Sequence, residues 1–82
     1  MASSVFTEDY RELLAILVEA RVASGLSQEK VGAKLGKPQS FVSKSENGER
    51  RVDVAEFCNL AEAMGRSPVE LFDEFLKRRK GA

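Results

Sequence analysis

The 82-residue sequence predicts an all-α fold, a compact bundle of five helices, and three observations lead to this prediction. Apolar residues recur three and four positions apart, whereas no stretch alternates between apolar and polar residues for long enough to form a strand. Glycine stands at positions 25, 36, 48 and 65, where each helical pattern stops, as a left-handed C-cap requires. A residue that commonly starts helices, serine, proline or aspartate, follows each of these glycines.

The first three helices are expected at about residues 7–24, 28–35 and 39–47. The first is predicted by a long apolar stripe, and the second begins after Ser27, which can cap it. The third begins at Pro38, whose missing N–H costs little in the first turn of a helix. The apolar positions of the first two helices are Tyr10, Leu13, Leu14, Leu17, Val18, Val31 and Leu35.

The fourth and fifth helices are expected at about residues 54–64 and 68–79. The stretches "DVAE", from Asp53, and "SPVE", from Ser67, are typical of capping boxes, which satisfy free backbone N–H groups at the start of a helix. The apolar positions are Val54, Phe57, Cys58, Ala61 and Met64 in the fourth helix, then Val69, Phe72 and Leu76 in the fifth, with Leu71 and Phe75 beside this last stripe.

The length predicts a single domain, residues 1–82, in which only the first and last few residues are disordered. One cysteine cannot form an internal disulfide, which suits the reducing cytosol. No apolar run is long enough to span a membrane, and the N-terminus has no signal-peptide layout. We therefore expect a cytoplasmic protein without a membrane partner.

The residue types also argue against an active site. The chain has no histidine, and its one cysteine has no nearby metal ligands, so no metal site is expected. It has no activated cysteine and no glycine-rich loop that could cradle a phosphate. The sequence therefore predicts a protein that is not an enzyme, with no catalytic residue, no cofactor and no small-molecule ligand.

The formal net charge is zero, with 13 basic and 13 acidic residues, but the charges are not evenly spread. Residues 27–52 carry six bases against three acids, whereas residues 53–76 carry six acids and one base. A local basic field can attract a polyanion even when the whole protein is neutral. Runs of solvated charge also arise by chance, so the pattern alone leaves both interpretations open.

The second and third helices are short, joined by "GKP", and together typical of a helix-turn-helix, whose second helix lies in the major groove of DNA. Gly32, on the inner face of the first of these helices, would let the other approach closely. The outer face of the third helix carries Gln39, Ser40, Ser43 and Lys44. Glutamine can pair with adenine, lysine can donate to guanine, and serine can contact bases or phosphates. The alternative is an ordinary solvated face.

Several stretches, "AR…GLSQ", "GAKLG", "SFVSKSENGERR" and "LAEAMG…S…ELF", follow one another in this order. Together they resemble the phage-repressor-type (lambda-repressor-like, Xre/Cro) helix-turn-helix family of prokaryotic transcriptional regulators, over about residues 10–73. The resemblance implies the five-helix lambda-repressor-like fold, with the helix-turn-helix at about 28–47. It also implies a sequence-specific regulator that binds double-stranded DNA and is nucleoid-associated when bound.

The resemblance implies a role for each matching residue. Gln28 would hold a phosphate and approach the first base pairs, and the base-contacting positions would be Gln39, Ser40 and Lys44, with Ser43 at their margin. Asn47 and the loop "GERR" would contact the DNA backbone, which assigns Arg50 and Arg51 to phosphates; solvent or a bridge to Asp53 is the alternative. Arg21 and Glu46 would form a buried ion pair. Two residues depart from the family pattern: Lys37 and Ser45 stand where apolar residues are common.

The resulting functional hypothesis is a repressor or autoregulator that reads a palindromic operator as a homodimer. Leu71, Phe72 and Phe75 are the expected dimer interface, because Leu71 and Phe75 share a face that the core would leave uncovered. In the alternative arrangement, Phe75 folds back onto Tyr10 and Phe6. The alternative function is an antitoxin or another protein-interaction module with the same fold.

Overall fold

The structure, a computed structural model, describes residues 7–80 and contains no strand in that range. The helices are α1 (Glu8–Ala23), α2 (Gln28–Leu35), α3 (Gln39–Glu46), α4 (Val54–Ala63) and α5 (Pro68–Lys80). Each helix end lies within one residue of its predicted position, so the all-α prediction is confirmed. The termini that the sequence predicts to be disordered lie outside the described residues.

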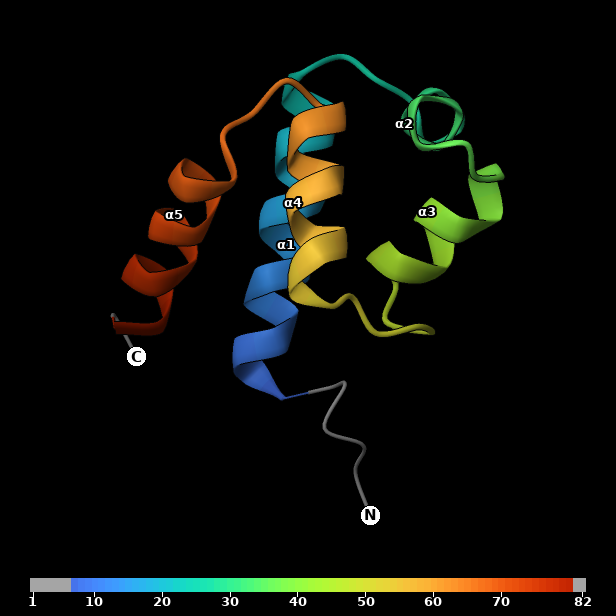
Figure 1. Cartoon of the computed structure of the whole chain (residues 1–82). Helices are drawn as coiled ribbons and strands as arrows, with labels where there is room; N and C mark the ends of the chain where they lie inside the picture. The colour runs from blue at the N-terminus through green and yellow to red at the C-terminus, as the bar shows by residue number, and fades with distance from the viewer. Residues whose placement is uncertain (1–6, 81–82) are drawn as a thin grey trace.

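The central helices α1 and α4 pack side by side, with α5 on one flank and the α2–α3 pair on the other (Figure 1). Helix α2 packs on α4 and α3 packs on α1, so each member of the pair is held by a different central helix. The loop between α3 and α4 is tied to α1, because the N–H of Val52 donates to the Tyr10 hydroxyl at 2.8 Å. This arrangement holds the second and third helices firmly on one side of the domain.

The predicted helix boundaries rest on local signals that the structure contains. All four punctuating glycines have positive φ, between 69° and 85°. Asp53 and Glu56 form the expected capping box at the start of α4, with each side chain accepting from the other residue's backbone N–H. At the start of α5, the N–H of Glu70 donates to Ser67 Oγ at 3.4 Å. These contacts lie within single short segments, which is why the sequence locates them.

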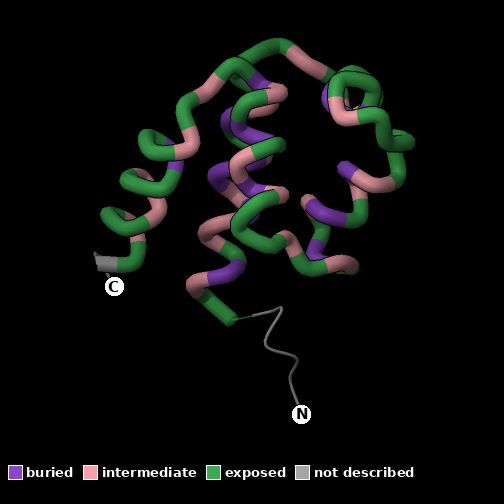
Figure 2. The backbone as a smooth tube through the Cα atoms, in the orientation of Figure 1, coloured by how far each residue is buried: buried purple, intermediate pink, exposed green. Residues whose placement is uncertain are grey.

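The core is built from buried side chains that all five helices supply, and the outer sides of α2 and α3 are largely exposed (Figure 2). The buried hydrophobic residues are Tyr10, Leu14, Ile16, Leu17, Ala20, Val31, Val42, Phe57, Leu60, Ala61, Met64 and Leu71. Within residues 7–80, no helix is both long enough and apolar enough to cross a bilayer.

The orientation of α5 differs from the prediction. Leu71 is fully buried in the core, whereas Val69 is 77%, Phe72 48% and Leu76 38% exposed. The expectation that Leu71 lies on an uncovered face is therefore wrong, and a residue that the core encloses cannot form a dimer interface. The apolar residues of the helix form one broad stripe, so periodicity alone could not choose which part of it packs inward.

Helix α5 is held in this orientation by Phe75 and by basic residues near its end. Phe75 is half-buried, packs against the core and lies 5.8 Å from the Phe72 ring, centroid to centroid. Arg78 pairs with Glu19 of α1, and the hydrogen bond between them lowers the pKa of Glu19. Phe75 therefore lies at the edge of the core, a cluster that includes Tyr10, one of the two residues onto which the alternative folds it. The other residue, Phe6, lies outside the described residues.

Gly32 lies where α2 meets the start of α3, as its predicted inner-face position requires. A Cβ at this position would lie 2.8 Å from the Lys37 carbonyl oxygen and 3.1 Å from that of Pro38. Both atoms belong to the backbone, so Gly32→Ala should destabilise the fold by about 1–3 kcal/mol through overpacking. Urea denaturation measures this, with Lys34→Ala, an exposed change on the same helix, as control. Equal midpoints for Gly32→Ala and wild type would contradict the close approach.

Candidate nucleic-acid interface

Helices α2 and α3 form one compact unit. Val31 and Val42 are 0% and 1% exposed, so each helix has a buried anchor. The turn between the helices is closed by a hydrogen bond from the N–H of Lys37 to the carbonyl of Gly32, at 2.9 Å. With both the turn and the inner faces fixed, the outer face of α3 is presented to solvent in one orientation.

The structure places most of the predicted DNA-contacting residues on or beside this outer face. Gln39, Ser40 and Lys44 are exposed, while Ser43 and Gln28 are half-buried. Their hydroxyl, amide and ammonium groups are the types that contact base edges and phosphates.

Asn47 and Arg51 lie after the end of α3, and both are exposed. The Asn47 amide closes its own loop: its Nδ2 donates to Glu49 Oε2 at 2.8 Å, and its Oδ1 accepts from the Glu49 N–H at 3.0 Å. The Arg51 guanidinium lies 4.9 Å from the centroid of the Tyr10 ring. Asn47 therefore stabilises the loop after α3, and Arg51 lies in the same loop with its guanidinium beside the Tyr10 ring.

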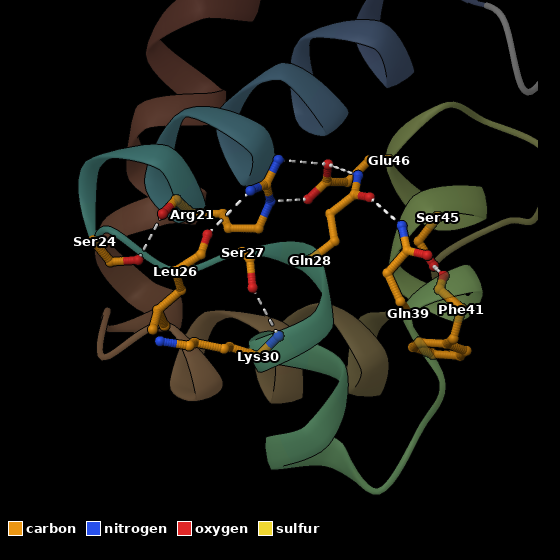
Figure 3. Close-up of polar contacts among 10 residues, drawn as sticks. All are labelled: Arg21, Ser24, Leu26, Ser27, Gln28, Lys30, Gln39, Phe41, Ser45 and Glu46. Carbon is orange, nitrogen blue, oxygen red and sulfur yellow. Dashed lines mark hydrogen bonds and ion pairs between the residues drawn. The ribbon is translucent and has the colours of Figure 1, made fainter.

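Four side chains form a continuous hydrogen-bonded chain from α1 to the start of α3 (Figure 3). Arg21 donates from Nε to Glu46 Oε2 at 2.6 Å and from Nη2 to Oε1 at 3.1 Å. Gln28 Nε2 donates to Glu46 Oε1 at 2.8 Å, and Gln39 Nε2 donates to Gln28 Oε1 at 2.6 Å. The side chains of Arg21 and Glu46 are only 15% and 12% exposed, so the chain begins at a shielded ion pair.

This chain fixes how the exposed amide of Gln39 is oriented. A carboxylate can only accept, so Gln28 must turn its Nε2 toward Glu46 and its Oε1 toward Gln39. One N–H of Gln39 is thereby used, while its Oε1 and its other N–H have no partner among residues 7–80. An acceptor and a donor on one planar amide are what a bidentate pair with adenine needs.

Arg50 is held at Glu56 of α4, not at Asp53, the alternative that the sequence left open. Its Nη1 and Nη2 lie 3.1 and 2.8 Å from the two carboxylate oxygens, and Nη1 also donates to Ser45 Oγ at 3.2 Å. The hydrogen bond between the two side chains raises the pKa of Arg50 and lowers that of Glu56. Sequence reasoning missed Glu56 as a partner, although the capping box indicated that its side chain turns back toward the loop before α4.

Comparison with known proteins matches this geometry to a family. The sequence model described as "Helix-turn-helix" matches residues 17–71, which include the whole of α2 and α3. The chain belongs to the Xre-type helix-turn-helix family. This confirms the predicted family and fold, and it confirms that the protein is not an enzyme, because the family is one of DNA-binding transcriptional regulators.

Two relatives show how far the likeness of this Xre-type regulator extends. An uncharacterized HTH-type transcriptional regulator, y4dJ, from Sinorhizobium fredii is 39% identical over 64 residues, which cover 77% of this chain and 83% of the relative. A solved structure of an XRE-family like protein from Pseudomonas syringae pv. tomato is 46% identical, with a TM-score of 0.82 and 85% of both chains covered.

The surface of this Xre-type regulator around α2 and α3 is basic. Arg21 neutralises Glu46, and Arg50 is paired with Glu56, so the exposed charges decide the local field. The exposed bases are Lys30, Lys34, Lys37, Lys44 and Arg51, against the exposed acids Glu29 and Glu49. The described part of the chain holds no cluster of three or more residues that could ligate a metal ion. A basic, polar face is suited to a nucleic-acid backbone.

Proposed function

We propose that this protein is a homodimeric repressor that binds a palindromic double-stranded DNA operator, with α3 of each protomer in the major groove. The observation that carries this proposal is the oriented amide of Gln39 on an exposed polar face, held through Gln28 and Glu46. Ordering a side chain before binding reduces the entropy that binding must offset. A solvated face without such a function needs no such chain of hydrogen bonds.

The roles follow from position and chemistry. Gln39, Ser40 and Lys44 contact base edges, and Ser43 lies at the margin of this set. The contacts that position the protein on the DNA backbone are assigned to Gln28, Asn47 and Arg51. Occupying an operator near a promoter is sufficient for repression, because it excludes other proteins from the same DNA.

Changes at the base-contacting residues test the proposal directly. Gln39→Ala and Lys44→Ala should each cost about 1–3 kcal/mol at the preferred site and relax the choice of base there. The preferred site is first selected from random duplexes with the purified protein, and fluorescence anisotropy then compares it with single-base variants. Lys77→Ala, an exposed change on α5, is the control that should leave both affinity and specificity unchanged. An equal loss over all DNA sequences would demote Gln39 and Lys44 to backbone contacts.

The proposed dimer interface is an apolar patch formed by Val54, Phe72, Phe75 and Leu76. Val54 is 80% exposed and Phe72 48% exposed, and both line a shallow apolar depression together with Phe75. Exposed large apolar side chains that lie together favour a partner surface. Two copies related by a two-fold axis would also read half-sites about 34 Å apart on a palindrome.

Phe72→Glu should prevent dimer formation and weaken operator binding, because a charge would replace a half-exposed ring at the centre of the apolar patch. Sedimentation at micromolar concentration measures the first effect, and anisotropy the second. Val22→Glu is the control, since Val22 is 63% exposed, lies on α1 and is not among the residues of the apolar patch or of the depression. A wild type that stays monomeric and binds its operator as tightly as Phe72→Glu does would contradict the dimer.

A further inference from the structure

Arg50 lies between α3 and α4 and contacts both. Its guanidinium holds the two carboxylate oxygens of Glu56 in α4 and reaches Ser45 Oγ in α3. The same group lies 4.4 Å from the centroid of the Phe41 ring, also in α3. Its backbone N–H donates to the Lys44 carbonyl at 3.2 Å. Arg50 therefore connects the C-terminal half of α3 to α4, a central helix of the domain.

Ser45 is the residue of α3 that Arg50 contacts by a side-chain hydrogen bond. It is 1% exposed, yet its small side chain gives the helix little apolar surface to bury at that point. Its hydroxyl donates to the Phe41 carbonyl at 2.7 Å and accepts from Arg50. A buried hydroxyl is costly without partners, so Arg50 supplies at this position a contact that an apolar side chain would otherwise provide.

Glu56 is a fixed partner for Arg50. Its Oε1 accepts the N–H of Asp53 at 3.3 Å, and its own N–H donates to Asp53 Oδ1 at 2.7 Å, which together form the capping box of α4. The carboxylate is thereby anchored to the start of a central helix. A bidentate arginine–carboxylate pair adds a defined geometry to its attraction.

We propose that Arg50 is a positioning residue, which sets the orientation of the C-terminal half of α3 through Ser45, Phe41 and Glu56 instead of contacting a phosphate. The inference rests on the proposed DNA binding. In this role, the pair of Arg50 and Glu56 holds Ser43 and Lys44 in one orientation toward the DNA.

Substitution of Glu56 separates the two possible roles of Arg50 because they predict opposite signs. If Arg50 contacts a phosphate, Glu56→Gln frees its guanidinium, removes a negative charge and tightens binding. If Arg50 positions α3, Glu56→Gln removes its anchor and weakens binding to the preferred site, as Arg50→Gln does.

The experiment measures wild type, Arg50→Gln, Glu56→Gln and the double variant on the preferred duplex and on an unrelated duplex, across a salt series. We expect each single variant to lose about tenfold in the ratio of specific to non-specific affinity, an effect of the size that contacting pairs show. The double variant should lose no more than either single variant, and the slope of log K against log salt should not change. Tighter binding by Glu56→Gln would overturn the proposal. So would a slope of log K against log salt that is shallower by about 1.8 for Arg50→Gln, because this is the change expected when each dimer loses two phosphate contacts.

Two controls exclude a general loss of stability. Arg66→Gln removes an ion pair to Glu74 whose arginine is as exposed as Arg50, at 33% against 32%, and which involves no residue of α3. It should leave the specificity ratio unchanged. Arg50→Lys keeps the charge but cannot form the bidentate pair with Glu56. It should therefore keep the slope of log K against log salt and recover only part of the ratio of specific to non-specific affinity.

A measurement without DNA separates this inference from the proposed function. The backbone amide resonances of Ser43 and Lys44 in the free protein should shift in Arg50→Gln and in Glu56→Gln, and remain in place in Arg66→Gln. A wild type that binds every duplex weakly and equally would end the proposed function, whatever these resonances show. Amide resonances that stay unchanged in a protein that does bind its operator would instead end the positioning role.

Discussion

Raising the salt concentration from about 50 to about 200 mM should weaken operator binding by about 10³–10⁵-fold if the two protomers together neutralise about 6–10 phosphates. The reason is that each contacted phosphate releases condensed counterions, and this release is less favourable at high salt. The exposed bases around α2 and α3, which we expect to make these contacts, are Lys30, Lys34, Lys37, Lys44 and Arg51. The measurement is an anisotropy titration with labelled operator across the salt series.

The same titration identifies which bases take part. Replacing a phosphate-contacting lysine with alanine removes one contact from each protomer, so the slope of log K against log salt should become shallower by about 1.8. Lys77→Ala lies on α5 and should leave the slope unchanged. A wild-type affinity that does not depend on salt would contradict the proposal that this protein binds DNA through phosphate contacts.

Replacing Arg21 or Glu46 alone with alanine should lower the free energy of unfolding by about 3–5 kcal/mol, because either change strands a shielded charge. Arg21→Ala leaves the Glu46 carboxylate, 12% exposed, with the amide of Gln28 as its remaining partner. Glu46→Ala leaves the Arg21 guanidinium, 15% exposed, with the Leu26 carbonyl at 3.0 Å. Chemical denaturation of the variants measures both losses.

The double variant Arg21→Met with Glu46→Leu should cost much less than either single change, since it removes both charges and keeps apolar volume. Arg66→Ala is the comparison for an exposed pair and should cost at most about 1 kcal/mol. Small and additive losses at Arg21 and Glu46 would show that solvent screens the pair. Glu46→Ala should also lower operator specificity, because Gln28 and Gln39 lose their anchor.

The sequence alone determined the five helices, their boundaries and the helix-turn-helix. The reason is physical: a capping box at Asp53, a positive φ at Gly36 and a close approach at Gly32 each depend on a few neighbouring residues. The exposed polar face of α3 could be predicted for a similar reason. Val31 and Val42 fix which sides of α2 and α3 are buried, and the polar residues must then lie opposite.

The family resemblance implied the pair of Arg21 and Glu46, which the structure contains, but only the tertiary structure decided the partner of Arg50. Arg50 was compatible with a phosphate, with solvent or with Asp53, and the packing of α3 against α4 places Glu56 within its reach. The chain from Arg21 through Glu46 and Gln28 to Gln39 likewise joins three helices, and its direction depends on distances that no local pattern contains. Pairing of this kind follows from the fold, because it requires residues that are distant in sequence to meet.

The tertiary structure also decided the face of α5 that packs inward. The apolar residues of the helix form one broad stripe that runs from Leu71 and Phe75 across Phe72 and Leu76 to Val69, so its sequence does not say which part of the stripe packs inward. The helix packs on α1 and α4 with one edge of this stripe inward, so Leu71 is fully buried while Phe72 stays half exposed. A narrow apolar stripe determines the orientation of its helix, whereas the stripe of α5 is broad, so its orientation is set by the shape of the surface on which it packs.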